Sequence, residues 1–341
     1  MIMCADDDYR LRDYTAAKQQ VAELVRRSKQ TLHDLGIRDG EELCQALLVK
    51  LAEDRFNLVV VGQFKRGKSS LMNAVVGRAL LPTGLLPLTS AITALCYGPS
   101  ERVILRRKGW TLQPEIPLGE LEQYVTERGN PGNEKGLIEA RVELPLPFLR
   151  GGLYFIDTPG IGSARQENTA TTYEFLPEAD AIVFVTSVEA PLSDAEEGFL
   201  QDISRYARKL FAVVNKVDLV ADGEREQVLA YIRSGIEHCL GADQVRVFPL
   251  SAQRALESKL AGRAAGQQES GLEAFEAALT AYLTEERNRA LLLAIEDRLQ
   301  GILEQHEGVT AARVERRGAR TLQAVAGTAP AVPVAELKEG A

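Results

Sequence analysis

The sequence is poor in the residues that build disulfide frameworks and metal sites. Its three histidines are too few and too far apart for a metal site, and no CxxC pair occurs among its four cysteines, Cys4, Cys44, Cys96 and Cys239. No uninterrupted apolar run reaches the roughly 18 residues of a transmembrane helix, and the acidic start MIMCADDDYRLRDY is unlike a signal peptide. These absences predict a cytoplasmic protein without structural disulfides or zinc.

The charge balance is acidic, which limits the partners that the whole surface can attract. The 341 residues hold 48 Asp and Glu against 40 Lys and Arg, a formal net charge of −8. This balance argues against non-specific binding to nucleic acid or to an anionic membrane, although a local basic patch remains compatible with it. We expect no nucleic-acid partner, and an anionic ligand must be held by local geometry.

Hydrophobic periodicity divides the chain into helical ends and an α/β centre. Between residues 11 and 35 apolar side chains recur at helical spacing, and Gly36 offers a stop. Asp39, with Glu42 three residues later, resembles a cap for a second helix. Short β-rich runs then alternate with helical patterns, which predicts an α/β fold with a mainly parallel sheet. Within it, RVILRRKGWTLQPEI predicts a hairpin at Lys108-Gly109.

The C-terminal part is helical again. Its pattern runs to Arg317, with interruptions expected near Gly301 and Gly308, and the Ala/Pro/Val-rich end is expected to be disordered. We therefore divide the chain into N-terminal helices at 1–55, an α/β domain at 56–270, a C-terminal helix at 271–320 and a tail at 321–341. The helical ends either cover the sheet or pair as a small bundle beside it.

A glycine-bracketed loop follows the first β-rich run. The segment GQFKRGKS, residues 62–69, fits the pattern G-x-x-x-x-G-K-[ST] between a buried strand and an amphipathic helix. Backbone amides of such a loop and the helix N-terminus hold polyphosphate, with the lysine on the β and γ phosphates and the serine hydroxyl on Mg²⁺. The predicted nucleotide contacts are Gly62, Gln63, Phe64, Lys65, Arg66, Gly67, Lys68, Ser69 and Ser70.

Three downstream motifs supply the other contacts of a guanine nucleotide. In DTPG, Asp157 is expected to hold magnesium through water and Gly160 to offer an amide to the γ-phosphate. In NKVD, the Asp218 carboxylate can accept two hydrogen bonds from guanine, whereas adenine presents a lone pair at N1. The third motif, PLSA, places Ser251 and Ala252 for backbone contact with the guanine carbonyl, and Asn215 and Lys216 of NKVD are the remaining expected contacts. All four motifs stand in order at the carboxyl ends of predicted strands, where open α/β sheets bind ligands.

The segment LLPTGLLPLTSAITALCYG resembles switch I of the dynamin superfamily, particularly of bacterial dynamin-like proteins. Thr89 matches the threonine that caps the γ-phosphate and magnesium there, and Thr83 and Thr93 are poorer matches. The insertion at 100–150 and the helical ends also fit the family. The resemblance implies a P-loop GTPase domain at 56–270 with a mainly parallel central sheet, flanked by an N- and C-terminal helical neck bundle.

The phosphate loop departs from that of dynamins at two positions. Phe64 and Lys65 replace a water-positioning glutamine and a cation-holding serine, a pattern closer to guanylate-binding proteins, where an arginine acts as a finger. We expect Lys65, with Arg66 as the second candidate, to supply catalytic positive charge. The alternative is a solvated basic pair without a catalytic role. The expected catalytic residues are Lys65, Lys68 and Thr89, and the expected metal contacts are Ser69, Thr89 and Asp157.

The resemblance further implies hydrolysis of GTP to GDP and phosphate, a nucleotide-dependent homodimer through the GTPase heads, and a family role in membrane remodelling at the inner face of a membrane. Membrane contact is expected only through stalk parts, for which the chain after Arg317 has too little apolar material. A GTP-dependent switch with negligible hydrolysis is the alternative. A ribosome-assembly GTPase fits less well, because the chain is acidic and has no RNA-binding appendage.

Overall fold

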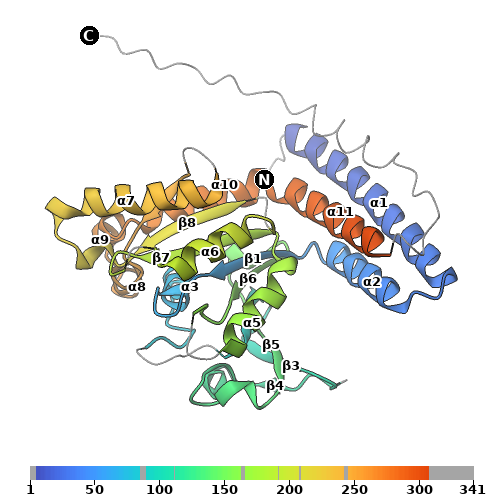
Figure 1. The fold of residues 1–341 in the computed structure, drawn as a ribbon, viewed down its shortest axis with the longest axis horizontal. Helices are drawn as coiled ribbons and strands as arrows, with labels where there is room; N and C mark the ends of the chain where they lie inside the picture. The colour runs from blue at the N-terminus through green and yellow to red at the C-terminus, as the bar shows by residue number, and fades with distance from the viewer. Residues whose placement is uncertain are drawn as a thin grey trace, which may run out of the picture. The chain divides into compact units, whose positions relative to one another are not determined.

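The computed structural model describes residues 5–84, 90–110, 112–162, 166–190, 192–206, 209–241 and 245–306. Two compact units divide the chain. Residues 54–290 form the first, which we call the head, and the residues up to 53 and from 291 onward form the second, which we call the helical unit. Figure 1 shows both, coloured along the sequence.

The described part of the head is built on a nine-stranded sheet in the order β4-β3-β5-β2-β6-β1-β7-β8-β9. Its strands are β1 Phe56–Val61, β2 Ile92–Tyr97, β3 Arg102–Arg107, β4 Glu115–Ile116, β5 Leu137–Leu144, β6 Leu153–Asp157, β7 Ala181–Ser187, β8 Leu210–Asn215 and β9 Val247–Pro249. Pairings from β6 through β1, β7 and β8 to β9 are parallel, as is β2 with β5. The predicted α/β fold with a mainly parallel sheet is confirmed, and so is the hairpin, in which β3 and β4 pair antiparallel.

Helices cover both faces of the head's sheet, and side chains of β8 show how. Ala212 and Val214 join a core with Phe199 of α6 and Ile232 of α7, whereas Phe211 packs on the rings of α10. A strand buried on both faces reads as a continuous apolar run rather than an alternating one. The helices are α3 Lys68–Val76, α4 Glu122–Val125, α5 Gln166–Phe175, α6 Asp194–Ile203, α7 Asp222–Leu240, α8 Ala252–Leu260, α9 Ala264–Glu269 and α10 Leu272–Glu285, with 3₁₀ turns η1 Leu118–Glu120, η2 Pro131–Asn133, η3 Pro147–Leu149, η4 Leu176–Glu178 and η5 Val217–Leu219.

The head extends to residue 290, beyond the division at 270 drawn from the sequence, because α10 belongs to its core. Phe275 and Tyr282 of α10 lie edge-on to Phe211, with ring centroids 6.1 and 5.6 Å away. Aromatic pairs in this geometry stabilise a core beyond the area that they bury.

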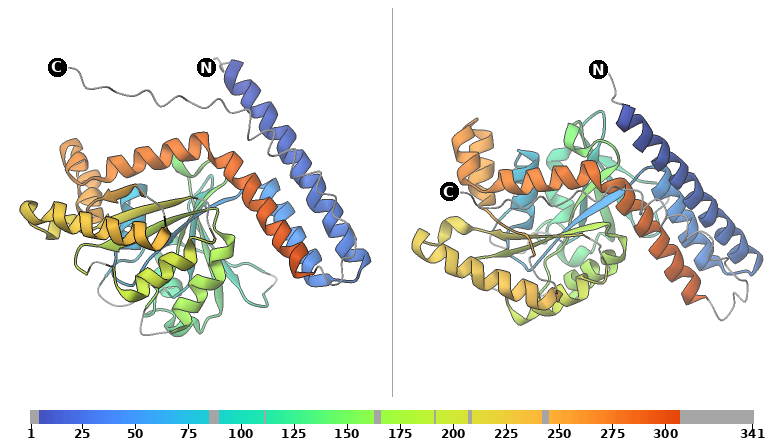
Figure 2. Two further views of the ribbon diagram at one scale, coloured as in Figure 1. Left: turned by 45° about the horizontal axis from the view of Figure 1, so that its top comes forward. Right: turned by 90° about the horizontal axis from the view of Figure 1, so that it is seen from above.

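The helical unit combines the two N-terminal helices with the last described helix. It contains α1 Ala5–Asp34, α2 Arg38–Ala52 and most of α11 Arg287–Gln305, which lie side by side in Figures 1 and 2. Buried side chains recur every three or four residues along α1, at Val21, Val25, Ser28 and Leu32, as expected for an amphipathic helix facing a core. Gly36, with φ of +74°, ends the first helix as predicted.

Two helix boundaries differ from the sequence expectation. The N-cap of α2 is Ile37, without a side-chain cap bond, so Asp39 lies within the first turn and its predicted capping role is wrong; its charge still favours the helix N-terminus. The C-terminal helical stretch breaks at Glu286 rather than near Gly301, which lies inside a continuous α11. Gly308 lies outside the described residues. No helix in the described part of the chain combines the length and apolar composition needed to cross a bilayer.

Candidate functional site

The phosphate loop, Gly62–Ser69, joins β1 to α3 and needs glycine at both ends. Gly62 has φ of +148°, and a Cβ there would lie 2.2 Å from the carbonyl oxygen of Val185 in β7. Gly67 has φ of +91°, and a Cβ there would lie 2.2 Å from the Nδ2 of Asn215. Both positions combine a backbone conformation that L-residues rarely adopt with space for hydrogen only. The loop is therefore shaped by its neighbours.

Lys68 opens α3 at the end of this loop and is buried, with 7% of its surface exposed. Its Nζ donates to the carbonyl oxygens of Gly62 and Gln63 at 3.1 and 3.3 Å. Burial lowers the pKa of Lys68 to about 8, against the opposing attraction of Asp157 and Glu196. The helix also leaves the amides of its first turn, including Ser69 and Ser70, without intrahelical partners, which makes this end a site for anions.

Ser69 and Asp157 meet beside the loop. The Ser69 hydroxyl donates to Asp157 Oδ2 at 2.6 Å, while Asp157 Oδ1 is buried and has no hydrogen-bond partner. Burial raises the pKa of Asp157, opposed by the charge of Lys68 and by hydrogen bonds from Ser69 and the Thr158 amide. An orphaned carboxylate oxygen next to a hydroxyl suits Mg²⁺, which is held by one or two protein oxygens, substrate phosphates and water.

The threonines expected near the metal are only partly described. Thr89 lies outside the described residues. Thr93 pairs with Asp157 across β2 and β6, and its Oγ1 is buried without a hydrogen-bond partner. Thr83 is exposed. Among the described residues no cluster of three or more His, Cys, Asp or Glu side chains could hold a metal.

Gly160 brings the loop after β6 against the phosphate loop. A Cβ on Gly160 would lie 2.7 Å from the Cα of Phe64. Two hydrogen bonds bind the same segments together: the Ile161 amide donates to the Gly62 carbonyl, and the Phe64 amide donates to the Ile161 carbonyl, both at 3.2 Å. A shift of either loop must therefore move the other.

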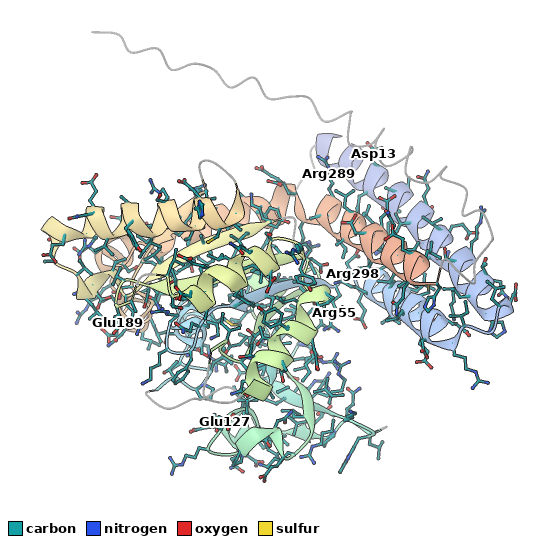
Figure 3. The ribbon with its side chains drawn as sticks, in the orientation of Figure 1. Asp13, Arg55, Glu127, Glu189, Arg289 and Arg298 are labelled. Atoms are coloured by element: carbon teal, nitrogen blue, oxygen red, sulfur yellow. The ribbon has the colours of Figure 1, made fainter. Side chains whose placement is uncertain are left out.

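Asn215 links the phosphate loop to the end of β8. Its Nδ2 donates to the carbonyl oxygen of Arg66 at 2.9 Å, and its Oδ1 accepts from the amides of Lys216 and Ala252 at 2.8 and 3.0 Å. Asn215 thus fixes three separate loops by their backbones. The Lys216 ammonium forms an ion pair with Glu189, which is labelled in Figure 3.

Asp218 and Ser251 lie in the loops that Asn215 joins. Asp218 belongs to η5, and its Oδ2 is 3.8 Å from the Nε of Arg254, an ion pair in which Asp218 keeps 18% of its side chain exposed. Ser251 caps α8 by accepting a hydrogen bond from the Arg254 amide at 3.3 Å. The motifs expected to read the base therefore lie together.

Arg66 was expected either to be solvated or to point outward as a catalytic finger, and it does neither. It is 6% exposed, and its guanidinium donates to both carboxylate oxygens of Glu196 at 2.9 and 2.6 Å. It also donates to Ser187 Oγ at 3.1 Å and to Gln63 Oε1 at 2.9 Å. The guanidinium fork suits such bidentate pairing. Arg66 ties the phosphate loop to β7 and α6.

Lys65, unlike Arg66, lies on the surface of the loop. It is exposed, and its φ of +66° lies in the left-handed region that few residues other than glycine enter. Its Nζ lies 5.4 Å from the ring centroid of Phe64, within cation–π range. No ion pair joins Lys65 to another described residue. Backbone strain of this kind gathers at functional loops.

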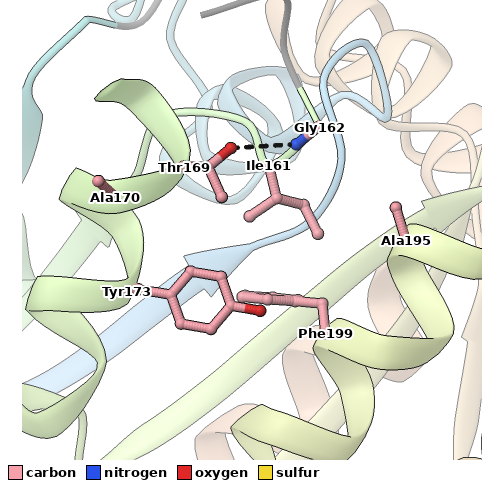
Figure 4. A pocket seen from close by; sticks show the side chains of 7 residues that line it. All are labelled: Ile161, Gly162, Thr169, Ala170, Tyr173, Ala195 and Phe199. Atoms are coloured by element: carbon pink, nitrogen blue, oxygen red, sulfur yellow. Dashed lines mark hydrogen bonds between the residues drawn. The ribbon is translucent and has the colours of Figure 1, made fainter. Parts of the chain in front are cut away.

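An apolar pocket of about 640 Å³ borders the loop after β6 (Figure 4). Ile161 and Gly162 form one side, α5 contributes Tyr173, and α6 contributes Phe199. Tyr173 donates to Asp202 at 2.9 Å. The apolar lining of this pocket does not suit a charged nucleotide.

Glu196 is the residue that sequence reasoning missed. Its carboxylate is fully buried, and the capping box that it forms with Ser193 at the start of α6 could have placed it at a helix N-terminus. The Ser-x-x-Glu spacing gives no sign of Arg66, however, which lies 130 residues earlier. Only the assembled fold brings the two together.

Comparison with known proteins matches the Dynamin family to residues 58–217. An "Uncharacterized protein in xynA 3'region" from Caldicellulosiruptor sp. is 37% identical over 85% of this chain and 72% of its own length. The bacterial dynamin-like protein of Nostoc punctiforme is 27% identical over 73% of this chain. The "Probable transmembrane GTPase FZO-like, chloroplastic" of Arabidopsis thaliana is 32% identical over 62%. The chain spans only 40% and 21% of those last two proteins.

A solved structure of "an oligomerised bacterial dynamin pair" has the same fold. It superposes with a TM-score of 0.56 at 19% identity, covering 92% of this chain and 59% of that one. At this identity the likeness concerns the fold alone.

Proposed function

The chain belongs to the dynamin superfamily of GTPases, in its bacterial branch, and from that premise we propose that it binds GTP with Mg²⁺ and hydrolyses it to GDP and phosphate. The observation that supports this most strongly is the convergence on Asn215, whose side chain hydrogen-bonds the backbones of the phosphate loop, the NKVD motif and the loop after β9. One residue thereby couples the elements for phosphate and base.

The phosphate loop would hold the triphosphate through backbone amides and the N-terminus of α3. The Lys68 ammonium, which donates to two loop carbonyls, would donate to the phosphate that enters the loop. A bound phosphate would favour its charged form. Ser69 and Asp157 would hold Mg²⁺, which when bound neutralises charge on the β and γ phosphates.

Base selection would fall to Asp218. Its carboxylate would accept hydrogen bonds from guanine N1–H and the exocyclic amine, and the first turn of α8, which Ser251 caps, would lie near the guanine carbonyl. Ala252 donates its own amide to Asn215, so the loop is held in place for this contact. Adenine offers the wrong pattern at N1, which leaves the carboxylate unpaired and disfavours ATP.

Hydrolysis would proceed by in-line attack of water on the γ-phosphorus. The bond to the β–γ bridging oxygen breaks, GDP leaves with that bonding pair, and the proton of water passes to the phosphate product or solvent. Lys68 and Lys65 would stabilise charge that develops on the phosphate oxygens, and Thr89 would position the water. The exposed ammonium of Lys65 makes it available for this role, whereas the buried ion pair of Arg66 makes Arg66 a residue that shapes the loop.

Self-association and a membrane role extend the proposal. Two heads would pair across their nucleotide faces, and in the intact protein the cycle would drive membrane remodelling. The solved structure of an oligomerised bacterial dynamin pair carries a title about "sensing and tethering of membranes", which concerns that protein.

Steady-state phosphate release, measured with GTP and Mg²⁺ at several protein concentrations, tests the proposal. A turnover number that rises with protein concentration supports an enzyme activated by head pairing. Tight GTP binding without phosphate release would identify a switch instead. Lys68→Ala serves as the matched control, which should abolish both GTP binding and phosphate release.

A further inference from the structure

The tip of the β3–β4 hairpin carries exposed apolar side chains. Leu112 is 82% exposed and Trp110 58%, and on the neighbouring strand Ile138 is 42% exposed. Figure 1 shows this hairpin at the edge of the head's sheet, which the strand order places furthest from β9. Isolated exposed apolar residues are common, but an aromatic and an aliphatic side chain gathered at one projecting turn indicate a contact surface.

Positive charge accompanies these apolar side chains. The segment RRKGWTL, residues 106–112, holds three cations and no acid in a chain with a net charge of −8. Arg106 is paired with Glu139 at 3.1 Å, but within the described residues neither Arg107 nor Lys108 forms an ion pair. The Arg107 guanidinium lies over Trp110, 5.1 Å from its ring centroid. Lys108 is therefore exposed beside the apolar pair, whereas Arg107 is half-buried, with its Nε covered and its guanidinium also 5.7 Å from the Tyr124 ring centroid.

We propose that Arg107, Lys108, Trp110 and Leu112, which we call the hairpin tip, bind the surface of an anionic phospholipid membrane. Tryptophan prefers the headgroup level of a bilayer, where its ring is apolar and its N–H stays hydrated. Leu112 enters the acyl boundary, and the cations contact lipid phosphates. Because the rest of the molecule is acidic, the contact is local and orients the head.

Lipid fits this surface better than an acidic macromolecule does. Nucleic acid would use the cations and could stack on Trp110, but it offers nothing apolar for Leu112, the more exposed of the two apolar side chains. The inference is independent of the nucleotide site, since no residue of the hairpin tip belongs to it. The proposal places a membrane contact in the head, whereas the family resemblance implied one through stalk parts alone.

The chain contains a single tryptophan, so its fluorescence reports on the hairpin tip directly. We expect a blue shift when the 341-residue protein is mixed with vesicles of phosphatidylcholine containing one third phosphatidylglycerol, at about 0.1 M salt. Vesicles of phosphatidylcholine alone should give no shift. Sedimentation with the same vesicles gives the affinity.

Two variants separate the charge from the apolar contribution. Lys108→Gln should weaken vesicle affinity about fivefold, and Leu112→Asp about tenfold or more. Their matched controls, Arg205→Gln and Leu260→Asp, remove an exposed cation and an exposed leucine elsewhere and should bind as the parent does. Unchanged thermal unfolding shows that each variant is folded.

Four results with vesicles or protein alone would overturn the inference. They are no blue shift with anionic vesicles, an equal shift with neutral vesicles, a shift that needs only a higher protein concentration without vesicles, and vesicle binding that survives both hairpin variants. The third would point to a second copy of the chain. An equal shift on adding single-stranded RNA, with RNA displacing the vesicles, would also overturn it in favour of nucleic acid.

Discussion

Replacing Glu196 with alanine tests the ion pair that holds the phosphate loop to α6. The Glu196 carboxylate is fully buried, and the substitution removes the acceptor for two hydrogen bonds from Arg66 at 2.9 and 2.6 Å. The guanidinium stays behind with 7% of its side chain exposed. A buried pair broken on one side costs about 3–5 kcal/mol, because the remaining charge has lost both water and partner.

That cost predicts a large fall in thermal stability of the head. In a domain of this size, 1 kcal/mol corresponds to about 2–4 °C in Tm, so Glu196→Ala should lower Tm by about 6–20 °C. Arg66→Ala should have a similar effect, since it strands the carboxylate. The double variant should cost clearly less than the sum of the two, which identifies coupling between the side chains.

An exposed ion pair provides the control. Asp222 and Arg225 lie 2.7 Å apart on the surface of α7, with 91% and 37% of their side chains exposed. Asp222→Ala should change the free energy of unfolding by less than about 1 kcal/mol. If Glu196→Ala is as mild as Asp222→Ala, or if the two buried substitutions simply add, the ion pair does not hold the loop as described.

Three further predictions concern the chemistry of the loop. Burial lowers the pKa of Lys68 to about 8, and a bound phosphate favours the charged form of this lysine. GTP affinity should therefore fall above pH 8, and GTP binding at pH 8 should take up about half a proton. A binding enthalpy that does not depend on the buffer's ionisation enthalpy would contradict this. Gly160→Ala, whose Cβ would lie 2.7 Å from Phe64 Cα, should lower single-turnover hydrolysis about a hundredfold, and normal hydrolysis would show that the two loops do not touch as described. Lys65→Ala should lower the turnover number about a hundredfold with GTP affinity unchanged, and the proposed role is wrong if turnover also stays the same.

The sequence predicts best where backbone geometry dictates residue type. Gly62 and Gly67 were identified from a motif, and the structure gives the reason, since each has a positive φ and a neighbouring atom where a Cβ would be. The mainly parallel sheet follows from its buried apolar runs. Asp157 and Asn215 lie at strand ends, as the topology of an open sheet requires.

Prediction fails where the partner is distant in the chain or where two local preferences compete. Arg66 looks solvated in the sequence, because Glu196 can be recognised as its partner only in the folded head. Asp39 is a good capping residue, yet the N-cap of α2 lies two residues earlier, at Ile37. Gly301 should weaken a helix, but the packing of its neighbours Leu299 and Ile302 keeps α11 continuous.

Calorimetry with GTP and with ATP, each in the presence of Mg²⁺, tests the central claim that this loop grips a triphosphate whose base is chosen by Asp218. The account predicts heat of binding for GTP and little for ATP. Asp218→Ala should weaken GTP about a hundredfold, because two hydrogen bonds to a charged group are lost. Equal affinity for GTP and ATP, or no binding of GTP at all, would contradict it.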